Sequence, residues 1–208
     1  IMTKVIGIDL GTTFSAIASL DDLGNPEVLT SIEDNRKITA SAIYINDKNV
    51  IVGDKALNFI ASKPNKVILQ TKREMENDVV YSINKGNWTN DKSDIESYSP
   101  AQVSALILKK LKEYTSDVKR AVITVPAMFA ERARQATLEA AKMADIEVIE
   151  LINEPTAAVL HYASLPGVEI GGRVLIFDLG GGTFDVTIAD VKSKSVDVLT
   201  SRGDKYLG

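Results

Sequence analysis

The chain has 208 residues, of which 45% are hydrophobic and 25% charged, with a net charge of −4 and no cysteine. This composition is typical of a folded globular protein, and it excludes a disulfide framework or a thiolate metal site. It also argues against nucleic-acid binding, which usually needs a concentrated basic face. The sequence contains no apolar run long enough to span a bilayer and no signal peptide. We therefore expect no membrane contact and a cytoplasmic location.

A segment near the N-terminus recurs towards the other end of the chain. Val5 to Phe14 and Val174 to Phe184 each contain a short apolar run that ends in Asp-Leu-Gly and leads into Thr-Phe. A second β-rich run follows, so each copy predicts a strand, a tight glycine turn and an antiparallel strand. Third runs follow at Val28 to Thr30 and at Val196 to Ser201. We therefore expect two related sheets.

The stretch between the copies begins with β-type signals. Ala42 to Ile45 and Val50 to Val52 flank Asn-Asp-Lys-Asn and predict a hairpin. Glu74 to Ser99 is polar, with Trp88 as its only large anchor, and is interpreted as a peripheral hairpin region. Ser99-Pro-Ala-Gln102 is a capping box with proline at the first helical position, so a helix is expected to begin there.

Strands and helices then alternate. After the helix that starts at Ser99, we predict a strand at Val122 to Val125 and an alanine-rich helix at Phe129 to Ala144. A second strand is predicted at Val148 to Ile152 and a further helix from Pro155 through Tyr162. This alternation implies right-handed crossovers onto a mostly parallel region, and a mixed α/β fold.

The first Asp-Leu-Gly segment has the chemistry of a phosphate-binding turn. Gly11 lets the backbone approach an anion closely, and the hydroxyls of Thr12 and Thr13 can line phosphate oxygens. Asp9 would repel a phosphate unless a cation lies between them, and Mg²⁺ prefers one or two carboxylates with waters and phosphates. Taken alone, the segment also suits an ordinary hairpin turn with an Asx-type aspartate.

The second segment, Asp178 to Thr183, is more specific because it holds three consecutive glycines. Each costs about 0.5–1 kcal/mol relative to alanine, and a purely structural hairpin needs one or two. Two such hairpins from related halves can face each other and clamp one polyphosphate. The pattern is neither a Walker P-loop nor Gly-x-Gly-x-x-Gly.

These residues resemble the superfamily of actin, sugar kinases and heat-shock chaperones, and most closely the DnaK-type 70-kDa heat-shock chaperone family. The finer match lies in Gly7 to Ser15, Val125 to Thr137, Ile152 to Ala158 and Asp178 to Asp185, in the family's order. The resemblance implies an α/β, actin-like ATPase fold of the ribonuclease H-like type. The chain departs from the family pattern at Glu74-Met75-Glu76, where the family has Leu-Ile-Gly.

The resemblance also implies a division of the chain. Residues 1–38 and 96–167 would form the core of a first lobe, and residues 39–95 a small inserted subdomain. Residues 168–208 would begin a second lobe that is truncated.

The resemblance assigns roles to individual residues. Lys72 would position or activate the attacking water beside the γ-phosphate, and Glu154 would read Mg²⁺ and its water shell. From the residues alone, Lys72 and Arg73 are more typical of a solvated pair, and Glu154 of an acid at a helix start. The implied catalytic residues are Asp9, Lys72, Glu154, Asp178 and Thr183. The implied ATP- or ADP-binding residues are Gly11, Thr12, Thr13, Phe14, Gly180, Gly181, Gly182 and Thr183. The implied Mg²⁺ residues are Asp9, Glu154 and Asp178, with K⁺ as a further candidate cation.

Four further residues are expected to lie outside the set that binds the nucleotide. Pro126 and Arg134 resemble a family relay between nucleotide state and the substrate domain. On local grounds Pro126 simply ends a strand and Arg134 lies on an exposed helix turn. Asp185 is expected to serve the second hairpin or partner contacts, and His161, the single histidine, to be structural or on the surface.

The implied function is that of a chaperone ATPase domain. It would assist protein folding by nucleotide-gated peptide binding, with unfolded peptides, a J-domain co-chaperone and a nucleotide exchange factor as partners of the full-length protein. The adenosine-binding part of the family comes after the position that Gly208 resembles. We therefore expect ATP hydrolysis by these residues alone to be weak or absent, and uncovered strand edges to favour self-association.

Two alternatives share the same hairpins. A sugar or small-metabolite kinase would need a carboxylate base between them, and Asn153 to Ala158 argues against it because it is chaperone-like. An actin-like filament protein would form sedimentable polymer on nucleotide addition.

Overall fold

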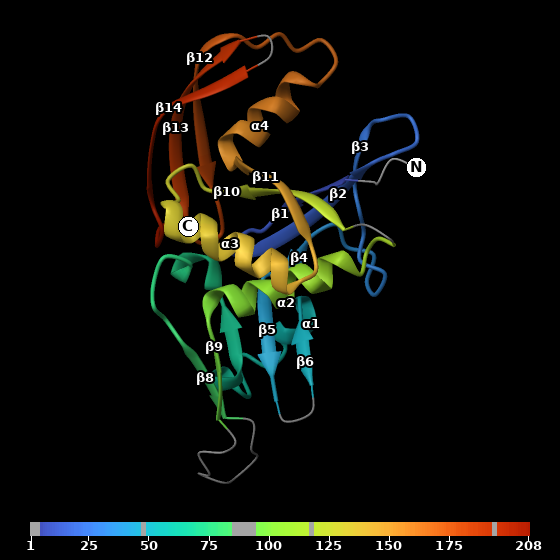
Figure 1. Ribbon diagram of the computed structural model, residues 1–208, viewed down its shortest axis with the longest axis vertical. Coiled ribbons are helices and arrows are strands. Elements are labelled where there is room, and N and C mark those ends of the chain that lie inside the picture. The colour runs from blue at the N-terminus through green and yellow to red at the C-terminus, as the bar shows by residue number, and fades with distance from the viewer. Residues whose placement is uncertain (1–4, 47–48, 85–94, 117–118, 193–194) are drawn as a thin grey trace.

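The computed structural model describes residues 5–46, 49–84, 95–116, 119–192 and 195–208. Three parts follow one another along the long axis of the molecule (Figure 1). The strands β12, β13 and β14 lie with helix α4 at one end, helices α2 and α3 lie in the middle, and β5, β6, β8 and β9 lie at the other end. Within the described ranges, no helix combines the length and the apolar character needed to cross a membrane.

The main sheet contains the first predicted hairpin and the predicted parallel region. Its order is β11-β10-β1-β2-β3, with β4 also pairing with β2. β1 is parallel to β10 and β10 to β11, whereas β1 and β2 are antiparallel. These strands are β1 (Val5–Asp9), β2 (Phe14–Leu20), β3 (Pro26–Val28), β4 (Thr39–Ala40), β10 (Arg120–Val125) and β11 (Glu147–Asn153).

Three longer helices accompany this sheet: α2 (Pro100–Lys112), α3 (Glu131–Met143) and α4 (Glu154–Ala163). The predicted capping box of α2 is present, because Ser99 Oγ accepts from Gln102 N at 3.3 Å and Gln102 Oε1 accepts from Ser99 N at 2.8 Å. The start of α2 is therefore determined locally, as the sequence predicts.

The core of the molecule lies between the main sheet and the helices α2 and α3. Ile6 and Ile8 of β1 belong to one apolar cluster with Ile107 and Leu111 of α2 and Ala140 of α3. The small alanine side chains of α3 allow the helix to lie close to its neighbours, as the alanine-rich pattern predicts. This packing fixes β1, and with it the turn that follows Asp9.

The middle of the chain forms smaller sheets. The sheet β6-β5-β7 contains the predicted hairpin of β5 (Ala42–Ile45) and β6 (Val50–Val52), together with β7 (Val67–Leu69). The predicted peripheral hairpin is β8 (Tyr81–Asn84) with β9 (Ile95–Tyr98), while its predicted anchor Trp88 lies outside the described residues. Short helices complete this part: α1 (Asp54–Leu57), η1 (Pro64–Lys66) and η2 (Thr71–Glu74).

The second copy of the repeat forms its own sheet. β12 (Gly172–Leu179) and β13 (Phe184–Lys192) are antiparallel, and β14 (Ser195–Asp204) pairs with β13. The repeat therefore yields the predicted strand, glycine turn and antiparallel strand in both places, and the predicted pair of related sheets is confirmed.

Candidate functional site

The turns of the two repeated hairpins open onto the same cleft, which has a volume of about 430 Å³. Most of the site residues predicted from the sequence line it, although they come from distant parts of the chain. Gly182, Pro126 and Arg134 are the predicted residues outside this lining. The lining residues are Asp9, Gly11, Thr12, Thr13, Phe14, Lys72, Thr124, Glu154, Ala157, Ala158, Asp178, Gly180, Gly181 and Thr183.

The two turns approach each other so closely that side chains would not fit between them. A Cβ at Gly181 would lie 2.7 Å from Thr13 Oγ1, and a Cβ at Gly182 would lie 3.1 Å from Thr12 Cγ2. Heavy atoms in van der Waals contact stay farther apart, so both positions require glycine for the observed approach. Contact between the hairpins therefore explains Gly181 and Gly182, two of the three consecutive glycines.

Hydroxyl groups lie at this contact. Thr12 is 8% exposed, and Thr13 Oγ1 is buried with no hydrogen-bond partner among the described residues. A buried polar atom left unpaired costs free energy, and native structures pair the large majority of such atoms. Together with the backbone N–H groups of two glycine turns, the hydroxyls suit a ligand that carries several anionic oxygens.

A buried ion pair forms one side of the cleft. Lys72 Nζ donates to Glu154 Oε1, and the two side chains are 9% and 18% exposed. Burial raises the pKa of the Glu154 carboxyl; Lys72 opposes this shift, and the carboxylates of Asp9 and Asp178 add to it. The cleft therefore concentrates acidic groups around a single lysine.

The carboxylates of the cleft suit a hard cation only if a bound ligand supplies further oxygen atoms. Within the described ranges, no three Asp, Glu or His side chains gather closely enough to hold a metal by themselves. Asp9, Asp178 and Glu154 nevertheless line one cleft, and Asp9 Oδ1 accepts a hydrogen bond from Thr124 Oγ1 at 3.0 Å. Oxygen donors of this kind fit Mg²⁺, which is usually held by one or two carboxylates plus substrate phosphates.

Arg73 is a site residue that the sequence analysis missed, because local reasoning placed it in a solvated pair with Lys72. Its Nε donates to the carbonyl oxygen of Gly182 at 3.0 Å and its Nη1 to Gln70 Oε1 at 2.6 Å. Its guanidinium also lies 5.6 Å from the centre of the Tyr206 ring. Arg73 thus joins η2 to the second hairpin, and Lys72 is a buried partner of Glu154. The solvated-pair interpretation is wrong because Lys72 pairs with Glu154 at the start of α4, and Arg73 donates to Gly182 in the turn of the second hairpin.

Asp185 lies beside the second hairpin, as expected. It is 7% exposed, and its Oδ1 has no hydrogen-bond partner in the described part of the chain. Burial raises the pKa of its carboxyl, and the charge of Asp178 acts in the same direction. It pairs in register with Asp178 on β12, so the second hairpin carries one exposed and one buried carboxyl group.

Pro126 and Arg134 lie behind the cleft. Pro126 is buried and follows the last residue of β10, as local reasoning predicts. The prediction that Arg134 lies exposed is wrong: it is half-buried, its Nε donates to the Phe129 carbonyl at 3.1 Å and its Nη2 to Asn153 Oδ1 at 2.7 Å. Asn153 is distant in the sequence and Phe129 lies in a loop, so no local pattern predicts these contacts. His161 is exposed on α4 and does not line the cleft.

The fold and the paired hairpins define the class of protein. Residues 5–208 match the model of the Hsp70 protein family, so the chain belongs to this family of heat-shock chaperones and the predicted actin-like ATPase fold is confirmed. The chain is also 40% identical over 209 residues to the chaperone protein DnaK of Mycoplasmopsis agalactiae. That alignment covers 98% of this chain and 33% of DnaK, so the chain spans about a third of the length of this curated relative.

Proposed function

We propose that this chain is an ATP-binding and ATP-hydrolysing region of an Hsp70-type chaperone. The observation that carries the proposal is the meeting of the two repeated Asp-Leu-Gly hairpins at one cleft, with the Lys72–Glu154 pair at its side. A polyphosphate bound in this cleft would touch both turns.

The two turns would bind the phosphates. The backbone N–H groups and hydroxyls of residues 12–13 and 181–183 would donate to phosphate oxygens, and Phe14 would line the same cleft. The N–H groups of Gly11 and Gly180 donate within the turns, to Ser15 Oγ at 3.1 Å and to the Thr183 carbonyl at 2.9 Å, so these two glycines would serve by letting the backbone approach the phosphates. Asp9, Asp178 and Glu154 would hold Mg²⁺, with K⁺ as a further candidate. When bound, Mg²⁺ neutralises charge on the β- and γ-phosphate oxygens.

Lys72 would then act at the reacting phosphate. Phosphoryl transfer depends mostly on positioning and on stabilising negative charge, and an ammonium group supplies both. Its pairing with Glu154 holds the ammonium inside the cleft. Lys72 would position or activate the attacking water, and Glu154 would contact Mg²⁺ and its water shell. Thr183 and the carboxylates of Asp9 and Asp178 would complete the catalytic set.

We also propose the division of the chain that the resemblance implies, with residues 1–38 and 96–167 as one lobe core, 39–95 as an insertion and 168–208 as the start of a second lobe. It is supported by the sheet order β11-β10-β1-β2-β3, which brings the first two segments together. Pro126 and Arg134 would form the relay, since Arg134 connects the loop after Pro126 to Asn153, the neighbour of Glu154.

The activity and partners of the whole protein follow from the family. We propose nucleotide-gated binding of unfolded peptides in the cytoplasm, with a J-domain co-chaperone and a nucleotide exchange factor as partners. For the 208 residues alone we propose weak or absent hydrolysis, because Phe14, Ala157 and Ala158 are the only apolar side chains among the cleft-lining residues that the structure describes and offer little to an adenine base. We also propose weak self-association through the exposed strand β12, which sedimentation velocity at rising concentration would measure.

Phosphate binding can be tested by ³¹P NMR of Mg·ATP titrated with the chain. This experiment detects millimolar binding, and we expect the β- and γ-phosphate resonances to shift more than the α resonance. Gly181→Val should abolish the shift by filling the contact with Thr13, whereas Lys109→Ala on the exposed face of α2 should preserve it. Unchanged resonances with the native chain at millimolar nucleotide would overturn the proposal.

Hydrolysis can be tested separately by single-turnover assays with the chain in excess. Whatever rate the native chain shows, Lys72→Ala should lower it by about 100-fold, the typical effect of removing one charge-stabilising donor, while Lys109→Ala should not. A turnover comparable with that of the longer protein would contradict the proposed weakness of these residues alone.

A further inference from the structure

The turn that carries Lys72 is attached to two helices by the residues that follow it. Met75 is 3% exposed, and its Sδ accepts a hydrogen bond from Ser104 Oγ of α2 at 3.5 Å. Glu76 Oε1 accepts a hydrogen bond from the backbone N–H of Ala130 at 3.3 Å. The segment after η2 is therefore anchored to α2 by one residue and to the beginning of α3 by the next.

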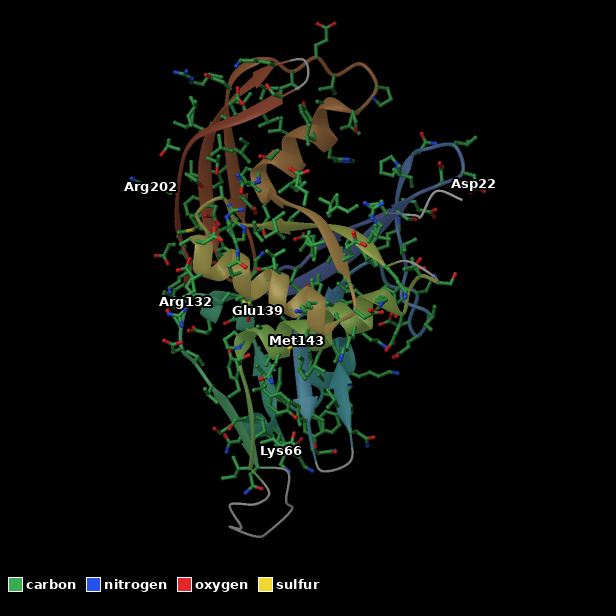
Figure 2. The ribbon with its side chains drawn as sticks, in the orientation of Figure 1. Asp22, Lys66, Arg132, Glu139, Met143 and Arg202 are labelled. Carbon is green, nitrogen blue, oxygen red and sulfur yellow. The ribbon has the colours of Figure 1, made fainter. Side chains whose placement is uncertain are left out.

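The contact made by Glu76 has an electrostatic reason. Ala130 is the N-cap residue of α3 and has no side-chain acceptor of its own. A helix N-terminus carries partial positive charge, which a carboxylate stabilises. Asp78 pairs with Arg132 in the first turn of the same helix, where Figure 2 labels Arg132, but both side chains are largely exposed, at 87% and 58%. The Glu76 hydrogen bond is solvent-exposed as well, but Glu76 itself is half-buried and its carboxylate reaches a backbone N–H at the start of the helix, where no side-chain cap is present.

The same end of α3 also reaches the other partner of the ion pair. Arg134 donates to the Phe129 carbonyl and to Asn153 Oδ1, and Asn153 immediately precedes Glu154. The chain itself leads from Lys72 to Glu76, whose carboxylate contacts the start of α3, and Arg134 of α3 contacts Asn153, the residue before Glu154. The direct pair between Lys72 and Glu154 closes this ring.

A small cavity confirms that these parts lie together. It has a volume of about 50 Å³, and Lys72, Glu76, Pro126, Phe129 and Asp185 are among its lining residues. Glu76 thus borders the space between the Lys72 turn and the loop that follows Pro126. Its position is also one where the chain departs from the family pattern, and a residue without a side chain there would make no such contact.

We infer that Glu76 is a positioning residue: by binding the N-terminus of α3, it fixes Lys72 relative to Glu154. This inference rests on the proposed roles of Lys72 and Glu154. It predicts that loss of the Glu76 carboxyl loosens the ion pair although neither partner is changed.

A triple-mutant cycle tests this without nucleotide. The coupling between Lys72 and Glu154 is measured by urea unfolding of Lys72→Ala, Glu154→Ala and the double variant, in the native chain and in the Glu76→Ala background. We expect the coupling to fall by roughly half or more in Glu76→Ala. Glu76→Gln, whose amide oxygen can still accept from Ala130, should restore it. Glu74→Ala is the matched control, because Glu74 lies on the same turn and contacts Asn77.

The coupling in the different backgrounds decides the inference. A coupling that is equal in all backgrounds would overturn it, even if Glu76→Ala lowers overall stability, because a merely structural role would produce that result. Glu154→Gln replaces Glu154→Ala if the latter fails to fold. Hydrogen exchange of the Ala130 amide provides a second measurement, and it should accelerate by about tenfold in Glu76→Ala but not in Glu74→Ala. Neither measurement uses nucleotide. A negative ³¹P titration would therefore reject the proposed function, while the mutant cycle and hydrogen exchange would still test whether Glu76 positions Lys72.

Discussion

The two copies of the Asp-Leu-Gly hairpin have similar sequences and opposite surroundings. At the equivalent apolar positions of the two copies, Ile6 corresponds to Leu175, Ile8 to Phe177 and Leu10 to Leu179. In the first hairpin they are 1%, 1% and 4% exposed, and in the second 64%, 66% and 63%. The helices α2 and α3 cover this face of β1, whereas the described parts of the chain leave the corresponding face of β12 uncovered. The motif therefore determines the strand and the turn, while burial depends on which other elements pack against it.

The largest difference between the hairpins is expected at the glycine after Asp-Leu. A Cβ at Gly11 would lie 1.9 Å from the backbone oxygen of Phe14, and Ser41 Oγ already holds the Gly11 carbonyl at 2.8 Å, so the turn cannot easily shift. A Cβ at Gly180 would lie 3.4 Å from the Thr183 oxygen, which is tolerable. We expect Gly11→Ala to destabilise the chain by roughly 3 kcal/mol and Gly180→Ala by less than about 1 kcal/mol, measured by urea unfolding. Similar losses at both positions would show that the turns are equally constrained.

The next effect concerns the apolar faces themselves. Ile8→Ala removes a side chain from the core and should cost about 3 kcal/mol, because the transfer and cavity costs add. Phe177→Ala removes an exposed ring and should cost less than about 1 kcal/mol. Thermal and urea unfolding of both variants would measure the difference. A large loss in Phe177→Ala at low protein concentration would mean that the ring is covered in solution.

The smallest expected effect is the difference in stability between removing an ion pair near the first hairpin and removing one in the second sheet. Hydrogen bonds from Lys110 and Lys55 lower the pKa of the Glu33 carboxyl to about 2. The ordinary value is 4.5, so the ionised form is favoured by folding. Its stabilisation is fully present above pH 4.5 and is lost as the pH falls through about 2. Glu33 is 35% exposed, so Glu33→Gln should cost about 1 kcal/mol at pH 7.

The control for this prediction lies in the second sheet. Lys192 pairs with Asp197 in the open, at 70% and 51% exposed, and Asp197→Asn should leave the unfolding midpoint unchanged. Unfolding of the native chain and both variants at several values between pH 7 and pH 2 would measure the effects. An effect of Glu33→Gln that persists undiminished at pH 2 would refute its electrostatic origin.

The sequence predicted much of the fold because the relevant signals are local. The capping box at Ser99 satisfies helix N–H groups within four residues, and the Asp-Leu-Gly turns reverse the chain within a few residues. Most of the predicted site residues line one cleft, while their roles stay predictions. The burial of Lys72 and the contacts of Arg73 and Arg134 could not be predicted from local patterns, because their partners Glu154, Gly182 and Asn153 are distant in the chain.

The sequence by itself therefore determined the two hairpins, the alternating strands and helices, and membership of the Hsp70 family. Periodicity, glycine turns and caps act over a few residues, so they can be recognised without the fold. Only the tertiary structure decided how closely Gly181 approaches Thr13, which face of each sheet is buried, and how Glu76 and α3 hold Lys72 beside Glu154. Those features depend on packing between segments far apart in the chain, and local propensities carry no information about it.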